Sequence, residues 1–330
     1  MAVVLFISVS CSQDDKIGGE EDYSGSKTDS IEVVLLTGEA TNIGYASATL
    51  NATYSIDNAE IVEGVAVFYY GMIDDVETLK VSGKKVVSDM LSDKNESFDV
   101  TITDLEPLTH YYYVACITIN NIEYYGSVKS FITDHEYVDL GLSVKWATCN
   151  VGASRPEEYG DYYAWGETEV KNDYCWNTYK WCKGSDVTLI KYCLDGSNGY
   201  NGYIDDKVEL ELDDDVAHVK WGGSWRMPTK CEQAELLDNC TWDWVEENGV
   251  NGYRVTSNMP GFTDSSIFLP VAGYRSSTSL SHTGSIGYYW SSSLDDDMQV
   301  FAWYINFNSA NDFSGSFSRV FGQSVRPVCQ

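Results

Sequence analysis

The segment 295–312 concentrates side chains that could bind a ligand. Its alternation of apolar and polar residues predicts a β-strand in which Tyr304, Asn306 and Asn308 share one face. Aromatic rings stack on sugar rings or apolar side chains, and amides both donate and accept hydrogen bonds. We therefore predict a ligand-binding surface built from Asp295, Asp297, Tyr304, Asn306, Asn308, Asn311 and Asp312. The alternative is an ordinary polar strand face beside a solvated acidic loop.

Catalytic chemistry has little support in the residue types present. The four histidines are scattered through the chain, and no HExxH, GxSxG, CxxC or phosphate-loop motif occurs. Adjacent carboxylates such as Glu157 and Glu158 are expected by chance in so acidic a chain, so they do not indicate a glycosidase. We predict no catalytic residues, no metal site and no cofactor. Calcium is conceivable at the acidic loops, but no calcium-binding motif supports it.

The charge and the apolar content restrict the class of protein. The chain of 330 residues has a formal net charge of −29, which repels phosphate backbones and makes nucleic acid an unfavourable partner. Its hydrophobic residues amount to 43%, too many for a disordered acidic chain. All ten tryptophans lie after residue 134, which places a domain boundary near Asp134. The expected domains are 31–134 and 135–330.

The N-terminus carries an apolar run at 2–9 that is too short to span a bilayer. It ends in small residues before Cys11, and an acidic, Gly- and Ser-rich stretch follows. This pattern resembles the lipobox of a bacterial lipoprotein, and the acidic residues look like the surface-export signal of Bacteroidetes lipoproteins. The resemblance implies a signal peptide at 1–10, lipidation of Cys11, and a flexible tether at 11–30. It also implies an outer-membrane protein that faces the exterior and meets the membrane only through its lipid anchor.

Residues 31–134 alternate short runs rich in Val, Ile, Tyr and Thr with turn residues, which predicts an all-β sandwich. Within it, Leu105, Pro107, Thr109 and Tyr111 occupy alternate positions that resemble the fibronectin type III consensus. We expect the Tyr111 hydroxyl to hydrogen-bond nearby backbone at that corner. We therefore predict that 31–134 is an immunoglobulin/fibronectin III-like spacer. Its strands are expected at 32–37, 45–54, 61–69, 77–87, 97–103, 110–119 and 123–132.

Residues 135–330 have short predicted strands, frequent Gly and Trp, and two predicted helices. The first helix is expected at 214–221. The second begins after Pro228 with capping-box spacing between Thr229 and Glu232, and it runs to about Asn239. Arg226, Arg275 and Arg326 are expected to bond backbone or carboxylate acceptors inside the scaffold. The seven cysteines are an odd number, which argues against a complete disulfide framework but leaves room for one local bridge among Cys175, Cys182 and Cys193.

The same region resembles the Fibrobacter succinogenes major paralogous (FISUMP) domain. The resemblance rests on a series of motifs in order at 137–142, 146–153, 157–168, 221–229, 268–275, 287–293 and 324–328. It implies an α+β C-type lectin-like fold with two short helices, a small sheet and long loops, in which the C-terminal region binds the ligand. Formylglycine-generating enzymes share that fold, but no cysteine here lies in a motif like their active site.

The expected function is therefore binding or adhesion. We predict a surface-anchored lipoprotein whose spacer presents a C-type lectin-like head to a glycan or a protein ligand. One alternative is an enzyme related to formylglycine-generating or carbohydrate-active proteins. A second alternative is a structural tip or accessory subunit of a surface fibre.

Overall fold

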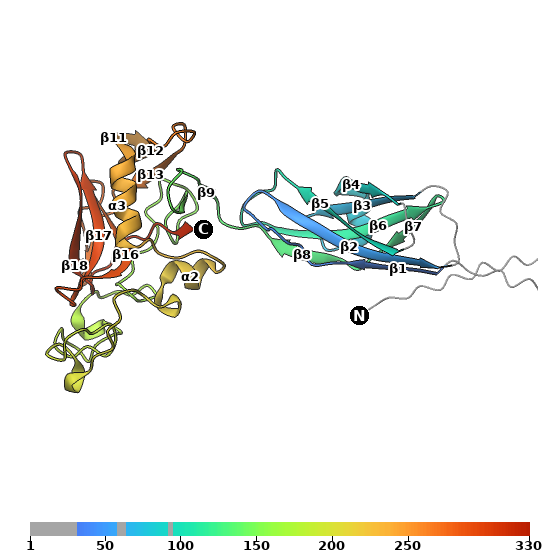
Figure 1. Cartoon of the computed structure of the whole chain (residues 1–330). Helices are drawn as coiled ribbons and strands as arrows, with labels where there is room; N and C mark the ends of the chain where they lie inside the picture. Colours follow the sequence, from blue (N-terminus) through green and yellow to red (C-terminus); the bar gives the residue numbers. More distant parts are fainter. Residues whose placement is uncertain (1–31, 58–63, 92–94) are drawn as a thin grey trace, which may run out of the picture. The chain divides into compact units, whose positions relative to one another are not determined.

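The computed structural model describes residues 32–57, 64–91 and 95–330 (Figure 1). The predicted signal peptide, the tether and the lipidation site Cys11 lie outside these residues. The chain divides into two compact units between His135 and Glu136, one residue after the boundary expected from composition.

The first unit is built from strands in two antiparallel sheets. One sheet has the order β1-β2-β5, and the other has the order β4-β3-β6-β7, with β8 also paired to β6. Their buried apolar side chains, including Phe68, Phe98 and Tyr113, form the core. The bounds are β1 Glu32–Thr37, β2 Ala48–Asp57, β3 Gly64–Gly71, β4 Lys84–Met90, β5 Asn95–Ile102, β6 His110–Ile119, β7 Ile122–Tyr125 and β8 Lys129–Ile132.

Two predictions for this unit can be checked directly. The backbone N–H of Glu106 donates to the Tyr111 hydroxyl at 3.0 Å, which confirms the predicted tyrosine corner. The strand expected at 77–87 is wrong over 77–82, where helix α1 (Val76–Ser82) lies, and strand β4 begins only at Lys84. The Asp75 carboxylate caps α1 by accepting from the Thr78 N–H at 2.7 Å, and Leu79 is buried among apolar residues of β3 and β6. The valines of this segment favoured a strand, whereas the cap and the burial of one helix face favour the helix.

The second unit combines two α-helices with small antiparallel sheets and long loops. Helix α3 (Lys230–Asn239) has the predicted capping box, in which the Thr229 side chain accepts from the Glu232 N–H and the Glu232 carboxylate accepts from the Thr229 N–H. Helix α2 (Val216–Trp221) begins two residues later than expected because Asp215 is its N-cap. Short 3-10 turns are η1 Trp176–Thr178, η2 Tyr200–Gly202 and η3 Leu212–Asp214.

The strands of the second unit form four sheets, with orders β9-β10-β19, β11-β12-β13, β14-β15 and β16-β17-β18. Helix α3 contacts all three strands of the last sheet (Figure 1). The bounds are β9 Tyr137–Val138, β10 Lys145–Ala147, β11 Cys240–Glu247, β12 Val250–Ser257, β13 Ser266–Pro270, β14 Tyr274–Ser276, β15 Ser279–Ser281, β16 Ile286–Leu294, β17 Phe301–Asn308, β18 Asp312–Ser318 and β19 Val328–Cys329.

Buried side chains with hydrogen bonds to backbone connect these elements. Arg326 is 1% exposed and donates to the carbonyls of Ala147, Thr148 and Phe268 as well as to Asn150 Oδ1. Arg226 forms a bidentate ion pair with the Glu232 carboxylate, in which Nη1 donates to Oε2 and Nη2 donates to Oε1. These contacts confirm the scaffold roles predicted for both arginines. The Arg275 guanidinium lies 5.3 Å from the centre of the Tyr162 ring.

In the described part of the chain, Cys175, Cys182 and Cys193 are free thiols. The local bridge considered among Cys175, Cys182 and Cys193 is therefore wrong. Burial raises the pKa of the Cys182 and Cys193 thiols, which keeps both protonated and less reactive. None of the described helices has the length and apolar character that a membrane-spanning helix needs.

Candidate functional site

The central residues of the predicted binding surface are buried. Tyr304 is 6% exposed and Asn306 is 5% exposed, so the expectation that they present an open polar face is wrong. Asn306 Nδ2 donates to the Tyr304 hydroxyl at 2.6 Å, and burial raises the Tyr304 pKa. The period-two pattern was predicted correctly, because Ile305 and Phe307 pack in one core cluster while Tyr304 packs in another. The alternating pattern of β17 could not show that side chains from other strands cover the face of Tyr304 and Asn306.

The side chains that cover this face are aromatic. Tyr288 of β16 stacks on Tyr304 with ring centres 5.9 Å apart and planes 12° apart. The ring centre of Phe317 of β18 lies 5.6 Å from that of Tyr304. The Trp290 ring packs edge-on against Tyr304, with ring centres 6.1 Å apart. Strand β17 is the middle strand of its sheet and has packed side chains on both faces.

Two other predicted residues build turns. Asp295 is 6% exposed, and its Oδ1 accepts from the N–H groups of Asp297 and Met298, both at 3.0 Å. Asn308 is half-buried, and its Oδ1 accepts from the N–H groups of Ala310 and Asn311 at 2.9 and 3.2 Å. These bonds satisfy backbone donors in the loops before and after β17, which is the usual role of Asx side chains in turns. Asn311 is exposed at the turn, and Asp312 is the first residue of β18.

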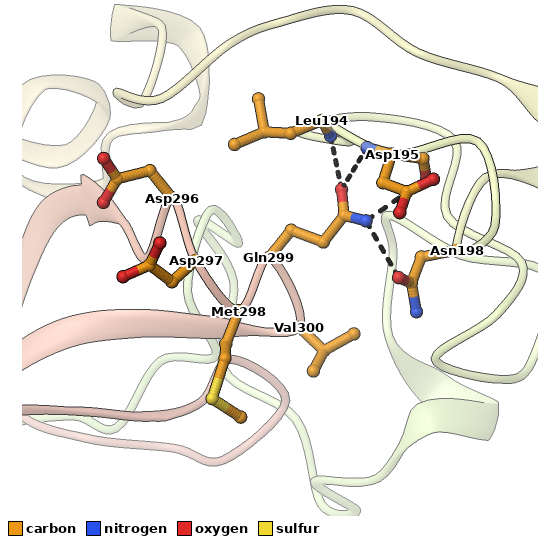
Figure 2. Close-up of a pocket in the computed structure, with 8 residues that line it drawn as sticks. All are labelled: Leu194, Asp195, Asn198, Asp296, Asp297, Met298, Gln299 and Val300. Atoms are coloured by element: carbon orange, nitrogen blue, oxygen red, sulfur yellow. Dashed lines mark hydrogen bonds between the residues drawn. The ribbon is translucent and has the colours of Figure 1, made fainter.

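The remaining predicted residue, Asp297, lines a pocket that the sequence did not reveal. The pocket has a volume of about 430 Å³ and lies between the segments 194–198 and 296–300 (Figure 2). Its lining combines oxygen-bearing and apolar side chains: Leu194, Asp195, Asn198, Asp296, Asp297, Met298, Gln299 and Val300. A volume of this size is typical of small-molecule sites.

Gln299 joins the two sides of the pocket. Its side chain is 6% exposed and extends from the segment before β17 toward the loop 194–198 (Figure 2). Gln299 Oε1 accepts from the N–H groups of Leu194 and Asp195, and Nε2 donates to the Asp195 carbonyl at 3.2 Å and to Asn198 Oδ1 at 2.8 Å. Every polar atom of this buried amide is thus used to hold the loop in place.

Arg319 holds the residues that lead into the same loop. Its side chain is fully buried, and Nη1 donates to the carbonyls of Tyr192 and Gln299 at 2.8 and 3.1 Å. Nη2 donates to the Lys191 carbonyl at 3.1 Å. Because one guanidinium bonds both Tyr192 and Gln299, it fixes the spacing between the two pocket-lining segments.

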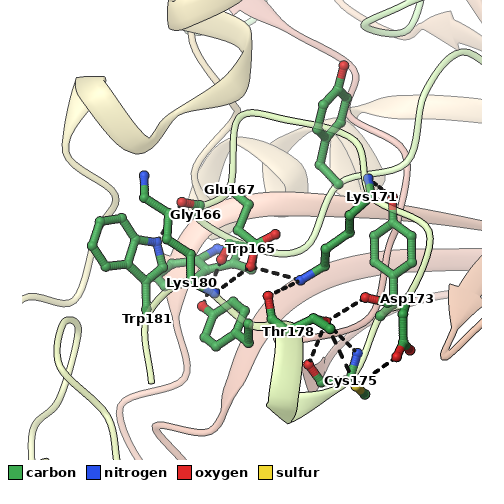
Figure 3. A network of polar contacts seen from close by, with 12 residues as sticks. Trp165, Gly166, Glu167, Lys171, Asp173, Cys175, Thr178, Lys180 and Trp181 are labelled. Atoms are coloured by element: carbon green, nitrogen blue, oxygen red, sulfur yellow. Dashed lines mark hydrogen bonds and ion pairs between the residues drawn. The ribbon is translucent and has the colours of Figure 1, made fainter. Parts of the chain in front are cut away.

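The long loop before this region has its own polar network (Figure 3). Lys171 Nζ donates to Glu167 Oε1 at 2.9 Å and to the Thr178 carbonyl at 3.2 Å. Glu167 Oε1 also accepts from the Lys180 N–H at 2.7 Å, and the Trp181 indole donates to the Gly166 carbonyl. Apart from the short 3-10 turn η1, these contacts fold 165–181 without helix or strand. The Trp181 ring also packs edge-on against Tyr192, just before the loop 194–198.

The chemistry of the pocket is that of a hydrogen-bond acceptor site. Asp195 and Asp297 are exposed. Asp296 Oδ1 forms an ion pair with Lys230 Nζ at 3.6 Å. The backbone N–H of Ser197 donates a hydrogen bond that lowers the pKa of the Asp195 carboxyl, and the Ser197 side chain adds to this effect. Both keep Asp195 ionised. Such carboxylates accept hydrogen bonds from hydroxyl or ammonium groups and repel anions. The described residues contain no group of three or more His, Cys, Asp or Glu that could hold a metal ion.

Sequence reasoning missed Leu194, Asp195, Asn198 and Gln299 for a physical reason. The segment 195–199 is recognisable as a turn from its Asp, Gly, Ser and Asn content. Nothing local pairs it with Gln299, which lies more than a hundred residues later. The sequence signal that did indicate this region was the acidic run 295–297 before the predicted strand. It identified Asp297 as a binding residue but none of the residues on the other side of the pocket.

Comparison with known proteins gives weak matches only. No protein-family model matches the chain, and no curated protein matches it. Among solved structures, the chain is similar to the sensor domain of the anti-sigma factor RsgI4 of Pseudobacteroides cellulosolvens, at 20% identity over 31% of this chain and 93% of that one, with a TM-score of 0.25. A fibronectin type III domain from the human KIAA0970 protein matches at 13% identity over 30% of this chain and 72% of that one, with a TM-score of 0.21.

Proposed function

We propose that this protein is a surface-anchored, non-enzymatic binding lipoprotein whose second unit binds a glycan. The first unit would be a fibronectin III-like spacer, and the second a C-type lectin-like head of the FISUMP kind. The observation that carries the proposal is the pocket between 194–198 and 296–300, where carboxylates stand beside apolar side chains. Sugars offer hydroxyl donors on their edges and C–H groups on their faces, so both kinds of lining have a partner.

The charge of the pocket narrows the ligand further. Asp195, Asp296 and Asp297 contribute three carboxylates, and Lys230 pairs with Asp296 from outside the pocket. No Lys or Arg among the described residues lines the pocket itself. Close like charges are costly across an interface, so a sulfated or uronic-acid-rich glycan would be rejected. The proposed ligand is therefore the uncharged or amine-bearing end of a glycan.

A glycan array with the full, unlipidated chain tests this proposal. Binding to uncharged or amine-bearing glycans is expected, and Asp297→Ala should weaken it about ten- to a hundredfold because a hydrogen bond to a charged group is lost. The matched control is Asp243→Ala, which removes an exposed carboxylate of β11 and should leave the affinity unchanged.

Three results would contradict the proposal. They are binding to no glycan, binding that ignores Asp297→Ala, and a preference for sulfated glycans. Binding to a secreted protein in a parallel array would point to a protein ligand instead. Release of reducing sugar from a bound polysaccharide would favour the carbohydrate-active enzyme.

The lipid anchor is a separate part of the proposal and rests on the sequence around Cys11. Radiolabelled palmitate should enter the wild-type protein in a host that processes lipoproteins. Cys11→Ala should abolish the labelling. Equal labelling of both proteins, or none of the wild type, would refute the anchor.

A further inference from the structure

Strand β18 is an edge strand of its sheet. In the described chain it pairs with β17 on one side, and no described strand pairs with its other side. Natural edge strands are commonly protected by lysine, proline or a bulge, because their free N–H and C=O groups can pair with another chain. Strand β18 contains no lysine or proline, and its register with β17 is continuous from Asp312 to Ser318.

The sequence of β18 is symmetric about Gly315. Residues 313–317 are Phe-Ser-Gly-Ser-Phe, which is the same in both directions. If two copies of this strand pair in antiparallel fashion about a twofold axis at Gly315, Phe313 of each copy lies opposite Phe317 of the other. Ser314 then lies opposite Ser316. Such self-complementarity is what a twofold interface requires, and cross-strand aromatic pairs and Ser pairs stabilise a sheet.

The side chains of β18 are available for this pairing. Phe313 is 48% exposed and Ser314 is exposed, while Phe317 is half-buried. Phe313 and Phe317 are on the face of the sheet that carries Tyr304, since they pair with Asn306 and Ala302 of β17. The second copy would cover Phe313 and extend the cluster of Tyr288, Tyr304 and Phe317 across the axis.

The charge distribution singles out the same surface for a second copy. The three strands of this sheet, β16 to β18, have Asp312 as their only charged residue. The whole chain has a net charge of −29, so most other surfaces repel a second copy. Depletion of charge with enrichment of aromatic residues is also the usual composition of an interface core.

From these observations we propose that the protein forms a twofold dimer through antiparallel β18–β18 pairing centred on Gly315. The two three-stranded sheets become one continuous sheet. The proposed pocket is lined by other segments and is not part of the dimer interface. Each dimer would therefore present two copies of the pocket, which would raise the avidity for a repeating ligand.

Sedimentation velocity on the full chain tests the dimer over a wide concentration range. The expected result is a reversible change from a 36.9 kDa monomer to a species of twice that mass. Higher salt should favour the dimer, because it screens the repulsion between the acidic surfaces. A chain that stays monomeric throughout would overturn the proposal.

Charge exchange tests the register. The double variant Ser314→Lys/Ser316→Lys should be monomeric, because like charges then lie opposite each other, although it lowers the net negative charge. Ser314→Glu/Ser316→Glu should also be monomeric, and an equimolar mixture of the two variants should restore the dimer. The control Thr278→Lys/Ser279→Lys adds the same charge on an exposed hairpin and should dimerise like the wild type. Dimers that persist in both β18 variants would refute the proposed interface.

A cross-link decides the case even if the charged variants fail to fold. A Cβ at Gly315 would come no closer than 3.5 Å to any neighbour, so Gly315→Cys fits the structure. Mild oxidation should join two copies through position 315, as shown by peptide mass spectrometry. Ser279→Cys should give no such link. If Gly315→Cys dimers lack the link at position 315, the register is wrong and the proposal fails.

Discussion

The side-chain amide of Gln299 pairs with both polar groups of the Asp195 backbone. The Asp195 N–H donates to Gln299 Oε1 at 2.9 Å, and Gln299 Nε2 donates to the Asp195 carbonyl at 3.2 Å. The amide thus pairs with a loop residue as a neighbouring strand would. Because Gln299 is buried, these hydrogen bonds are shielded from water and fix the distance between the two segments that line the pocket.

Replacing Gln299 with leucine should release this loop. Gln299→Leu removes the acceptor of two backbone N–H groups, and each unsatisfied buried group costs about 1–3 kcal/mol. We expect a loss of about 2–4 kcal/mol in the free energy of unfolding, measured by urea denaturation. Hydrogen exchange should accelerate at Leu194 and Asp195. Gln330→Leu, the same change at an exposed terminal residue, should shift stability by less than about 0.5 kcal/mol. If Leu194 and Asp195 exchange their amide hydrogens equally slowly in Gln299→Leu and in the wild type, Gln299 does not hold the loop in place.

Arg319 should be still less tolerant of substitution. Arg319→Met keeps most of the buried stem but leaves the carbonyls of Lys191, Tyr192 and Gln299 without their shared donor. A loss of about 3–5 kcal/mol is expected, measured by the same denaturation. Arg155→Met is a suitable control, because the Arg155 side chain is 65% exposed, although one of its two partners, Glu157, is buried. Similar losses for both variants would show that the carbonyl contacts of Arg319 contribute little.

Local sequence signals predicted most elements but not the site, and β17 shows why. Its period-two pattern gave the two faces correctly, because alternation is a property of the strand itself. Whether the face of Tyr304 and Asn306 is open depends on Tyr288 and Phe317, which come from other strands. The pattern cannot carry that information.

The same distinction separates α3 from the pocket. The start of α3 was predicted because the capping box is contained in four consecutive residues, Thr229 to Glu232. The pocket depends on the bonds of Gln299 and Arg319 to a loop more than a hundred residues earlier. Helix α1 is an intermediate case, since its Asp75 cap is local but the burial of Leu79 that favours it is not.

The cap of α3 gives a smaller and more local prediction. Thr229→Ala removes the hydroxyl that accepts from the Glu232 N–H at 3.2 Å. The expected cost is about 1 kcal/mol, or a fall of about 2–4 °C in Tm. Differential scanning calorimetry measures it, and Thr278→Ala on the exposed hairpin should leave Tm unchanged. An unchanged Tm in Thr229→Ala would mean that water or the Glu232 side chain compensates for the lost cap.

The pH dependence of stability should include a contribution from His135 at the end of the first unit. Burial lowers the pKa of His135 from 6.5 to about 4, although the nearby Asp134 carboxylate acts in the opposite direction. The folded state therefore resists protonation that the unfolded chain accepts. Stability from this group is present above pH 6.5 and decreases as the pH falls toward 4. An NMR titration of the His135 ring should give a midpoint near 4. His135→Gln should flatten the stability profile between those pH values, and a midpoint near 6.5 would contradict the burial of the ring.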